Sequence, residues 1–116
     1  MTAGQKIGRG SGDLLGILGG MGPLATADFL TKLIQMTPAS CDQEHIATLV
    51  YSLPQIPDRT AAILGQGASP LPDLLRGLAL LQEAGATCIA IPCNTAYYWY
   101  AEMAAASSVP ILHIVE

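Results

Sequence analysis

The stretch LLGILGG at residues 14–20 decides the fold. Its first five residues form an uncharged apolar run, and the pair Gly19-Gly20 ends that run. Such a run is typical of a short strand buried inside a parallel sheet. Pro23 follows where the first turn of a helix tolerates proline, and helical spacing of apolar residues predicts a helix from Leu24 to about Met36. The apolar residues at this spacing are Ala27, Leu30, Leu33 and Ile34.

The rest of the chain repeats this alternation of strand and helix. Apolar runs predict further strands at residues 46–51, 88–91 and 111–115. Helical spacing with start and stop signals predicts further helices at residues 59–64, from Leu71 to a stop at Gly85, and at residues 95–105. This order predicts an α/β fold in three layers, α-β-α, with a parallel four-stranded sheet and helices on both of its faces.

The composition excludes several classes of protein. Hydrophobic residues make up 51% of the chain and charged residues 12%, which excludes a disordered chain. Five Lys and Arg against nine Asp and Glu, with no basic cluster, give no surface for nucleic acid. No apolar run approaches the ~18 residues of a membrane-spanning helix. We therefore expect neither nucleic acid nor a membrane as a partner.

Length and cysteine usage suggest one domain in a reducing compartment. The 116 residues suit a single domain, which we place at residues 14–116 after a flexible N-terminal tail at residues 1–13. Three cysteines with no CxxC pair argue against a disulfide framework, so we expect a cytoplasmic protein. Because few charged residues are available to cover the surface, we expect some apolar surface to be buried against another domain or a second copy, as in a homodimer.

The order of elements also predicts where chemistry occurs. In an open parallel sheet, ligands bind outside the carboxyl ends of the strands. Three loops fit that description, at residues 19–23, 52–59 and 92–96.

Cys93, in the last of these loops, is the sharpest chemical signal. It lies between a predicted strand and a predicted helix, where the helix dipole and free backbone N–H groups favour a thiolate. Asn94 and Thr95 add hydrogen-bonding groups suited to an anion such as a carboxylate. The alternative is that Cys93 is one more small buried apolar residue.

The other two cysteines carry weaker signals. Cys88 lies inside a predicted strand, so we interpret it as a core residue. Cys41 lies in a loop four residues before His45, but a metal site there would need more ligands than the sequence offers.

The first loop contains a glycine-rich turn, and the second ends in the basic residue Arg59. Residues 20–25 match a loose G-x-G-x-x-A dinucleotide pattern, but the next predicted strand does not end in the acid that this motif needs. We interpret the glycines as a tight turn whose backbone approaches a small ligand closely. Arg59 ends a loop stiffened by two prolines, and its forked guanidinium could hold a carboxylate there; the alternative is a solvated surface arginine.

Taken together, these loops resemble the aspartate/glutamate racemase family, in particular its cofactor-independent aspartate and broad-specificity amino-acid racemases. The resemblance extends from Leu14 to Glu116 and rests on several motifs in the same order. The matching motifs are GGMGP at residues 19–23, DQEH at 42–45, PQIPDRT at 54–60, IPCNTA at 91–96 and PILHI at 110–114.

The resemblance implies a mechanism and a set of site residues. In the family, two similar α/β domains face each other across a cleft, and each supplies one cysteine from a strand–helix turn. One thiolate removes the α-proton of an amino acid, and the other thiol returns a proton to the opposite face, without pyridoxal phosphate or a metal. Carried over by motif, Cys93 is the acid/base of the first domain, Asn94, Thr95 and Met21 line the substrate site, and Arg59 binds a substrate carboxylate. The implied partner is a small molecule, namely aspartate, glutamate or another amino acid.

The sequence departs from the family in two ways, which leave alternatives open. Tyr97 stands where family members often have histidine, and the change could alter the acidity of the cysteine or the substrate preference. The chain corresponds to the N-terminal half of the family's fold, without the domain that carries the second cysteine. One alternative is therefore a truncated, catalytically incompetent fragment that keeps the fold and at most binds a dicarboxylic amino acid. Another is a decarboxylase or hydantoin racemase of the wider superfamily, although the PDRT segment at residues 57–60 favours the amino-acid branch.

Overall fold

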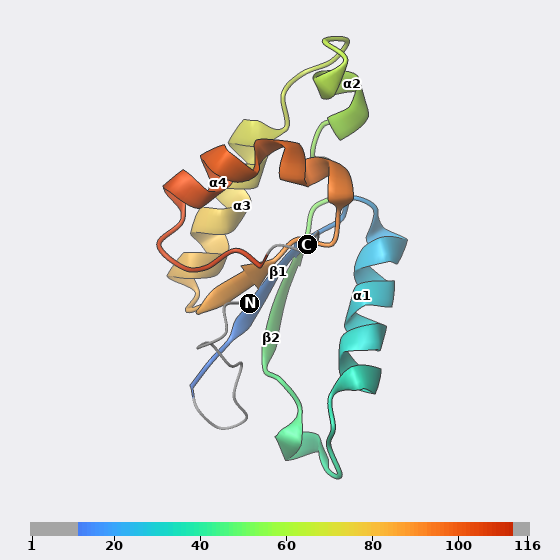
Figure 1. The fold of residues 1–116 in the computed structure, drawn as a ribbon, viewed down its shortest axis with the longest axis vertical. Helices are drawn as coiled ribbons and strands as arrows, with labels where there is room; N and C mark the ends of the chain where they lie inside the picture. The colour runs from blue at the N-terminus through green and yellow to red at the C-terminus, as the bar shows by residue number, and fades with distance from the viewer. Residues whose placement is uncertain (1–11, 113–116) are drawn as a thin grey trace.

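The computed structural model describes residues 12–112, which form three layers (Figure 1). The predicted tail therefore lies outside the described residues except for its last two positions, as do residues 113–116. In chain order the elements are β1 (Leu15–Gly19), α1 (Pro23–Met36), the 3₁₀ helix η1 (Asp42–Glu44), β2 (Thr48–Ser52), α2 (Arg59–Ile63), α3 (Leu71–Glu83), β3 (Cys88–Ala90), the 3₁₀ helix η2 (Asn94–Trp99) and α4 (Tyr100–Ala106).

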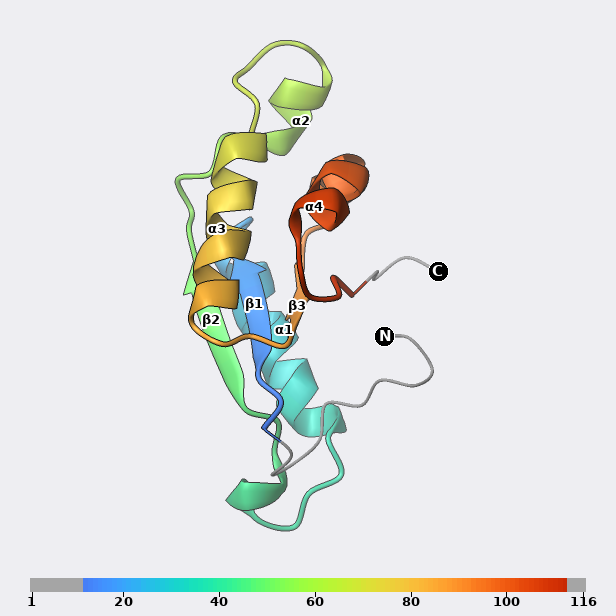
Figure 2. The ribbon, with the colours of Figure 1, turned by 90° about the vertical axis from the view of Figure 1, so that its left-hand side faces the viewer.

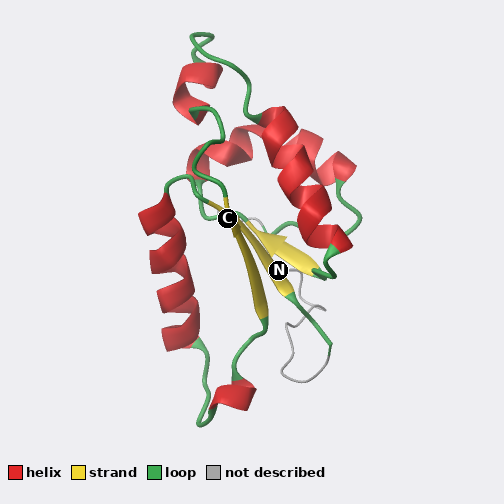
Figure 3. Ribbon diagram, turned by 180° about the vertical axis from the view of Figure 1, so that it is seen from behind, coloured by secondary structure: helices red, strands yellow, loops and turns green. Residues whose placement is uncertain are grey.

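The sheet is parallel, with β1 between β2 and β3 (Figure 3). Ile17 at the middle of β1 lies opposite Val50 of β2 and Ala90 of β3. Buried apolar strands of this kind are expected when helices cover both faces of a sheet. The prediction of an α/β fold with a parallel sheet is thus confirmed.

The prediction of four strands is wrong, because the sheet has three. Where the fourth was expected, Ile111 forms a single parallel bridge with Ile89. Leu112 donates its N–H to the carbonyl of Ile89 at 2.8 Å. Pro110, which precedes Ile111, has no N–H to donate and so cannot extend the ladder in that direction. The described part of this segment is therefore too short for a ladder, and residues 113–115 of the predicted strand lie outside the described residues.

Side chains of β1 alternate between the two faces of the sheet. Leu15 and Ile17 belong to a core cluster with residues of α1, and Leu18 belongs to the larger cluster with residues of α3 and α4. Gly77 lets α3 approach the sheet, since a Cβ at this position would come within 2.6 Å of a Leu18 methyl group. Figure 2 shows α3 and α4 side by side on this face, which confirms helices on both faces.

The segment after β3 differs from its predicted single helix. It begins as the 3₁₀ helix η2, because Ala96 and Tyr100 donate their N–H groups to carbonyls three residues back. Only from Tyr100 does the chain continue as the α-helix α4. Within residues 12–112, none of the helices has the length and apolar character needed to cross a membrane.

Candidate active site at the carboxyl ends of the strands

The carboxyl ends of the three strands point to one end of the molecule, where α1 and η2 begin and α2 lies (Figure 1). A pocket of about 350 Å³ opens there. All five residues expected in the site line this pocket: Met21, Arg59, Cys93, Asn94 and Thr95. The structure therefore brings together three loops that are far apart in the sequence.

Cys93 is mostly buried but reaches the pocket. Its residue is 8% exposed, and its Sγ lies 3.3 Å from Oγ1 of Thr95, with either atom able to donate the hydrogen. The residue caps the start of η2 in an extended conformation. The thiol thus has both a polar neighbour and an opening, so it is not sealed within hydrocarbon as a purely structural cysteine would be.

Arg59 is held in place by its own loop. Asp58 accepts a hydrogen bond from the backbone N–H of Ala61 at 3.0 Å and so caps the helix that Arg59 begins. Nη1 of Arg59 donates to the carbonyls of Ile56 and Pro57, both at 3.4 Å. Its Nε is shielded from solvent and has no hydrogen-bond partner among the described residues. Because Arg59 also lines the open pocket, its charged guanidinium is suited to an anion there.

The glycine loop places Met21 in the pocket. Gly20 has φ +98°, and a Cβ there would lie 2.4 Å from the backbone N of Leu53. Oγ1 of Thr26 accepts from the N–H of Gly20 at 2.8 Å and donates to the carbonyl of Gly22 at 3.2 Å. Gly20 thus brings this loop close to the backbone of Leu53, while the expected approach of the turn to a small ligand stays a prediction.

Two further residues line the pocket, and the sequence did not single them out. Pro92 stands beside Cys93, and Ala25 lies in the first turn of α1. Both belong to motifs that were already visible, but neither carries a group that signals chemistry. The rule that helices begin at the carboxyl end of the preceding strand would have pointed to Ala25.

Tyr97, in η2, contacts the chain after Pro110 and the first residue of α4. Its hydroxyl donates to the carbonyl of Leu112, and its ring stacks on that of Tyr100 with centroids 6.0 Å apart. Burial raises the pKa of Tyr97 from its ordinary value of 10.0 to about 12. The phenol therefore stays protonated at neutral pH, where histidine would titrate.

We expect Tyr97→Phe to change how stability depends on alkaline pH. Because the folded state raises this pKa, the unfolded chain ionises first, and the contribution of the phenol is complete below pH 10 and lost as pH rises through 12. Urea unfolding should show this loss in the original chain and a smaller one in the variant. Equal losses in the two proteins between pH 10 and pH 12 would contradict the account of Tyr97.

The other two cysteines lie away from this pocket. Cys88 is buried in β3, as predicted, and burial raises the pKa of its thiol. Cys41 is exposed just before η1. Among residues 12–112, no three His, Cys, Asp or Glu side chains come together as a metal ion would require.

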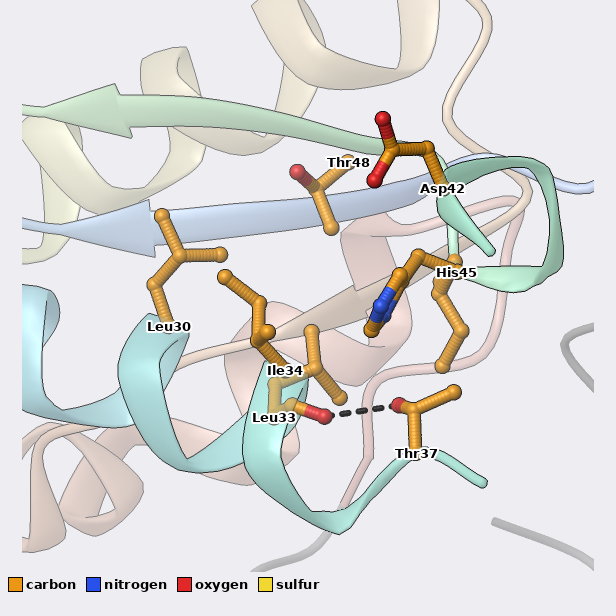
Figure 4. Close-up of a pocket in the computed structure, with 8 residues that line it drawn as sticks. Leu30, Leu33, Ile34, Thr37, Asp42, His45 and Thr48 are labelled. Atoms are coloured by element: carbon orange, nitrogen blue, oxygen red, sulfur yellow. Dashed lines mark hydrogen bonds between the residues drawn. The ribbon is translucent and has the colours of Figure 1, made fainter. Parts of the chain in front are cut away.

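A second pocket, of about 400 Å³, lies between the end of α1 and the start of β2 (Figure 4). Leu30, Leu33 and Ile34 give it an apolar wall, and Asp42 and His45 stand at its other side. It is larger than the first pocket, but it lies at the amino end of β2 and contains no thiol or guanidinium. We therefore place the candidate active site at Cys93.

Comparison with known proteins identifies the family of the chain. The sequence pattern of the Asp/Glu/Hydantoin racemase family matches residues 18–116. The chain belongs to this family. The resemblance stated above is thereby confirmed.

Three relatives that match this chain are longer than it. The broad specificity amino-acid racemase RacX of Bacillus subtilis (strain 168) is 37% identical, over 89% of this chain and 46% of its own length. The aspartate racemase of Picrophilus torridus is 38% identical and superimposes with a TM-score of 0.81, over 87% of this chain and 43% of its own. An aspartate racemase homologue from Pyrococcus horikoshii OT3, 21% identical over 88% and 45%, shares the fold with a TM-score of 0.70. The chain thus spans about half the length of these relatives.

Proposed function

We propose that this chain forms one half-site of an amino-acid racemase, in which Cys93 moves the α-proton of a dicarboxylic amino acid. The observation that carries the proposal is the presence of the Cys93 thiol and the Arg59 guanidinium in the same pocket at the carboxyl ends of the strands. Family membership and the aspartate racemase fold support the same class of reaction.

In the proposed step, Cys93 removes the proton and Arg59 stabilises the charge that develops. The Cys93 thiolate takes the α-proton, and the electron pair of the broken C–H bond moves into the adjacent carboxylate. Arg59 stabilises the negative charge that develops there, because a charged donor acts most strongly where charge builds up. Thr95 and Asn94 give hydrogen bonds beside the thiol, and the proposal involves no cofactor.

Return of the proton decides the stereochemical result. Among the residues that line the pocket, Cys93 supplies the single thiol. Protonation from this thiol restores the original enantiomer, whereas racemisation needs a second acid on the opposite face of the carbon. We therefore expect the described half-site to exchange the α-proton of one enantiomer and to racemise slowly.

Proton exchange in D₂O tests this function. The chain is incubated with L-aspartate or D-aspartate, and α-deuteration is followed by NMR while chiral chromatography follows racemisation. We expect deuteration of one enantiomer above the buffer rate with little racemisation. If neither enantiomer exchanges although aspartate binds, the alternative of a binding-competent but catalytically incompetent fragment is supported instead.

Arg59→Gln is expected to weaken aspartate binding by about tenfold or more, because a charge-assisted hydrogen bond to a carboxylate is lost. Titration calorimetry measures the change. Arg76→Gln is the matched control, since Arg76 lies on α3 outside this pocket. Equal affinity of the Arg59 variant and the original chain would remove Arg59 from the site.

A further inference from the structure

The DQEH motif at residues 42–45 has no part in the reaction proposed for Cys93. It lies at the other end of the sheet, where it forms η1 and leads into β2 (Figure 1). Asp42 and His45 of this motif line the pocket of about 400 Å³ in Figure 4, together with residues of α1 and β2. We call this the α1–β2 pocket, and its volume falls within the range of small-molecule sites.

One side of the α1–β2 pocket is apolar. Leu30, Leu33 and Ile34 line it from α1, and Ile46 adds to it just before β2 (Figure 4). Ile34 is 49% exposed, so the rest of the described chain leaves much of this apolar side chain uncovered. An apolar ligand group that covers this wall would be stabilised there, because apolar surface is removed from water.

The opposite side of the pocket is polar and carries a negative charge. Figure 4 shows the side-chain oxygens of Asp42 and Thr48 on this side, across from the apolar wall on α1. The residues that line the pocket include neither lysine nor arginine, and no ion pair within residues 12–112 involves Asp42. A ligand with a positive charge at one end would therefore supply the counter-ion of this carboxylate.

His45 adds a ring nitrogen without a partner. Its imidazole lines the pocket beside the apolar wall, and its Nδ1 is shielded from solvent and has no hydrogen-bond partner among the described residues (Figure 4). A neutral imidazole can present Nδ1 as an acceptor. Because buried polar atoms usually have a partner, a donor group next to this ring would be stabilised. An ammonium group combines three donors with a positive charge, which suits both Asp42 and His45.

Local hydrogen bonds hold both sides of the pocket in place. In the loop that carries the polar side, the side chain of Glu44 accepts from the backbone N–H and the hydroxyl of Ser40, at 2.7 and 3.1 Å. At the end of α1, Thr37 donates its hydroxyl to the carbonyl of Leu33 at 2.6 Å (Figure 4). The two sides are thus ordered before a ligand binds, which lowers the entropic cost of binding.

We propose that the α1–β2 pocket binds a small primary amine with an apolar body. The ammonium group pairs with Asp42, which is exposed at the rim, and the apolar body packs on the wall that α1 provides. An amino acid fits less well, because its carboxylate would find neither lysine nor arginine in the lining. The pocket shares no residue with the Cys93 pocket, so the inference goes beyond the proposed function and does not depend on it.

Titration calorimetry of the full chain with 2-phenylethylamine tests the proposal, and 3-phenylpropionate serves as an anionic compound of similar shape. We expect the amine to bind and the acid to bind about tenfold or more weakly, because Asp42 attracts the one and repels the other. Asp42→Asn should weaken amine binding about fivefold, as expected for an exposed ion pair at the upper end of its usual strength. Asp28→Asn is the matched control, since Asp28 lies on α1 outside the pocket, and should leave the affinity unchanged. Equal binding of amine and acid, no binding of the amine, or no effect of Asp42→Asn overturns the proposal.

Charge reversal gives a second test that misfolding cannot imitate. Asp42→Lys should make the pocket prefer 3-phenylpropionate to 2-phenylethylamine, since a positive charge then stands at the rim. A folded variant that still prefers the amine overturns the proposal. In the original chain, saturating amine should leave the alkylation of Cys93 by iodoacetamide unchanged, because the two pockets are separate. Slower alkylation would mean that the amine binds in the Cys93 pocket, which also overturns the proposal.

Discussion

Cys93→Ser is expected to reduce the rate of α-proton exchange by about 10²- to 10⁴-fold, which is the usual contribution of a positioned acid/base group. Serine keeps the size and the hydrogen bond toward Thr95, but its hydroxyl is a far weaker base than a thiolate. Affinity for aspartate should change little, because Arg59 and the rest of the pocket remain. NMR in D₂O measures the exchange, and calorimetry measures the affinity.

Cys41→Ser is the matched control for this substitution. Cys41 is exposed and lies outside the pocket, so its loss should leave the exchange rate unchanged. Exchange that persists in the Cys93 variant would show that another group moves the proton, and the proposed role of Cys93 would be wrong.

Gly20→Ala is expected to lower the free energy of unfolding by about 2 to 5 kcal/mol, the sum of two costs. The positive φ of +98° costs a non-glycine residue about 1–2 kcal/mol, and a tightly packed added methyl group costs about 1–3 kcal/mol. The methyl group would meet backbone atoms of Leu53 at 2.4–2.7 Å, which cannot move aside as a side chain could. Urea unfolding followed by circular dichroism measures the loss.

Gly65→Ala separates the two costs. Gly65 also has a positive φ, of +75°, but a Cβ there has no atom within 4 Å. This variant should lose only the conformational part, about 1–2 kcal/mol. If both variants lose the same stability, the contact of Gly20 with Leu53 does not constrain the loop that carries Met21.

Much of the sheet, and the pocket at the carboxyl ends of its strands, could be predicted from the sequence. The run at residues 14–18 predicted β1 because apolar residues followed by paired glycines leave few other structures for so short a segment. Because parallel strands share a carboxyl end, the sequence also predicts that the loops of Met21, Arg59 and Cys93 lie together, as the structure shows. The catalytic and binding roles of these residues stay predictions.

Other features depend on distant contacts that a single sequence does not reveal. The run after Pro110 has a strand's composition, but in the described part it makes a single bridge with Ile89. Local spacing could not show that Gly20 packs on Leu53, or that the Arg59 guanidinium would bind the carbonyls of its own loop. These features arise from how elements pack, which periodicity does not encode.

Alkylation of the cysteines tests most directly whether the Cys93 thiol occupies an amino-acid site. The chain is treated with iodoacetamide with and without L-aspartate, and mass spectrometry follows Cys93 and Cys41 separately. We expect Cys93 to be alkylated and aspartate to slow its reaction, while the exposed Cys41 reacts at the same rate in both samples. Alkylation of Cys93 at a rate that aspartate does not change, or no alkylation of Cys93 at all, would contradict this expectation.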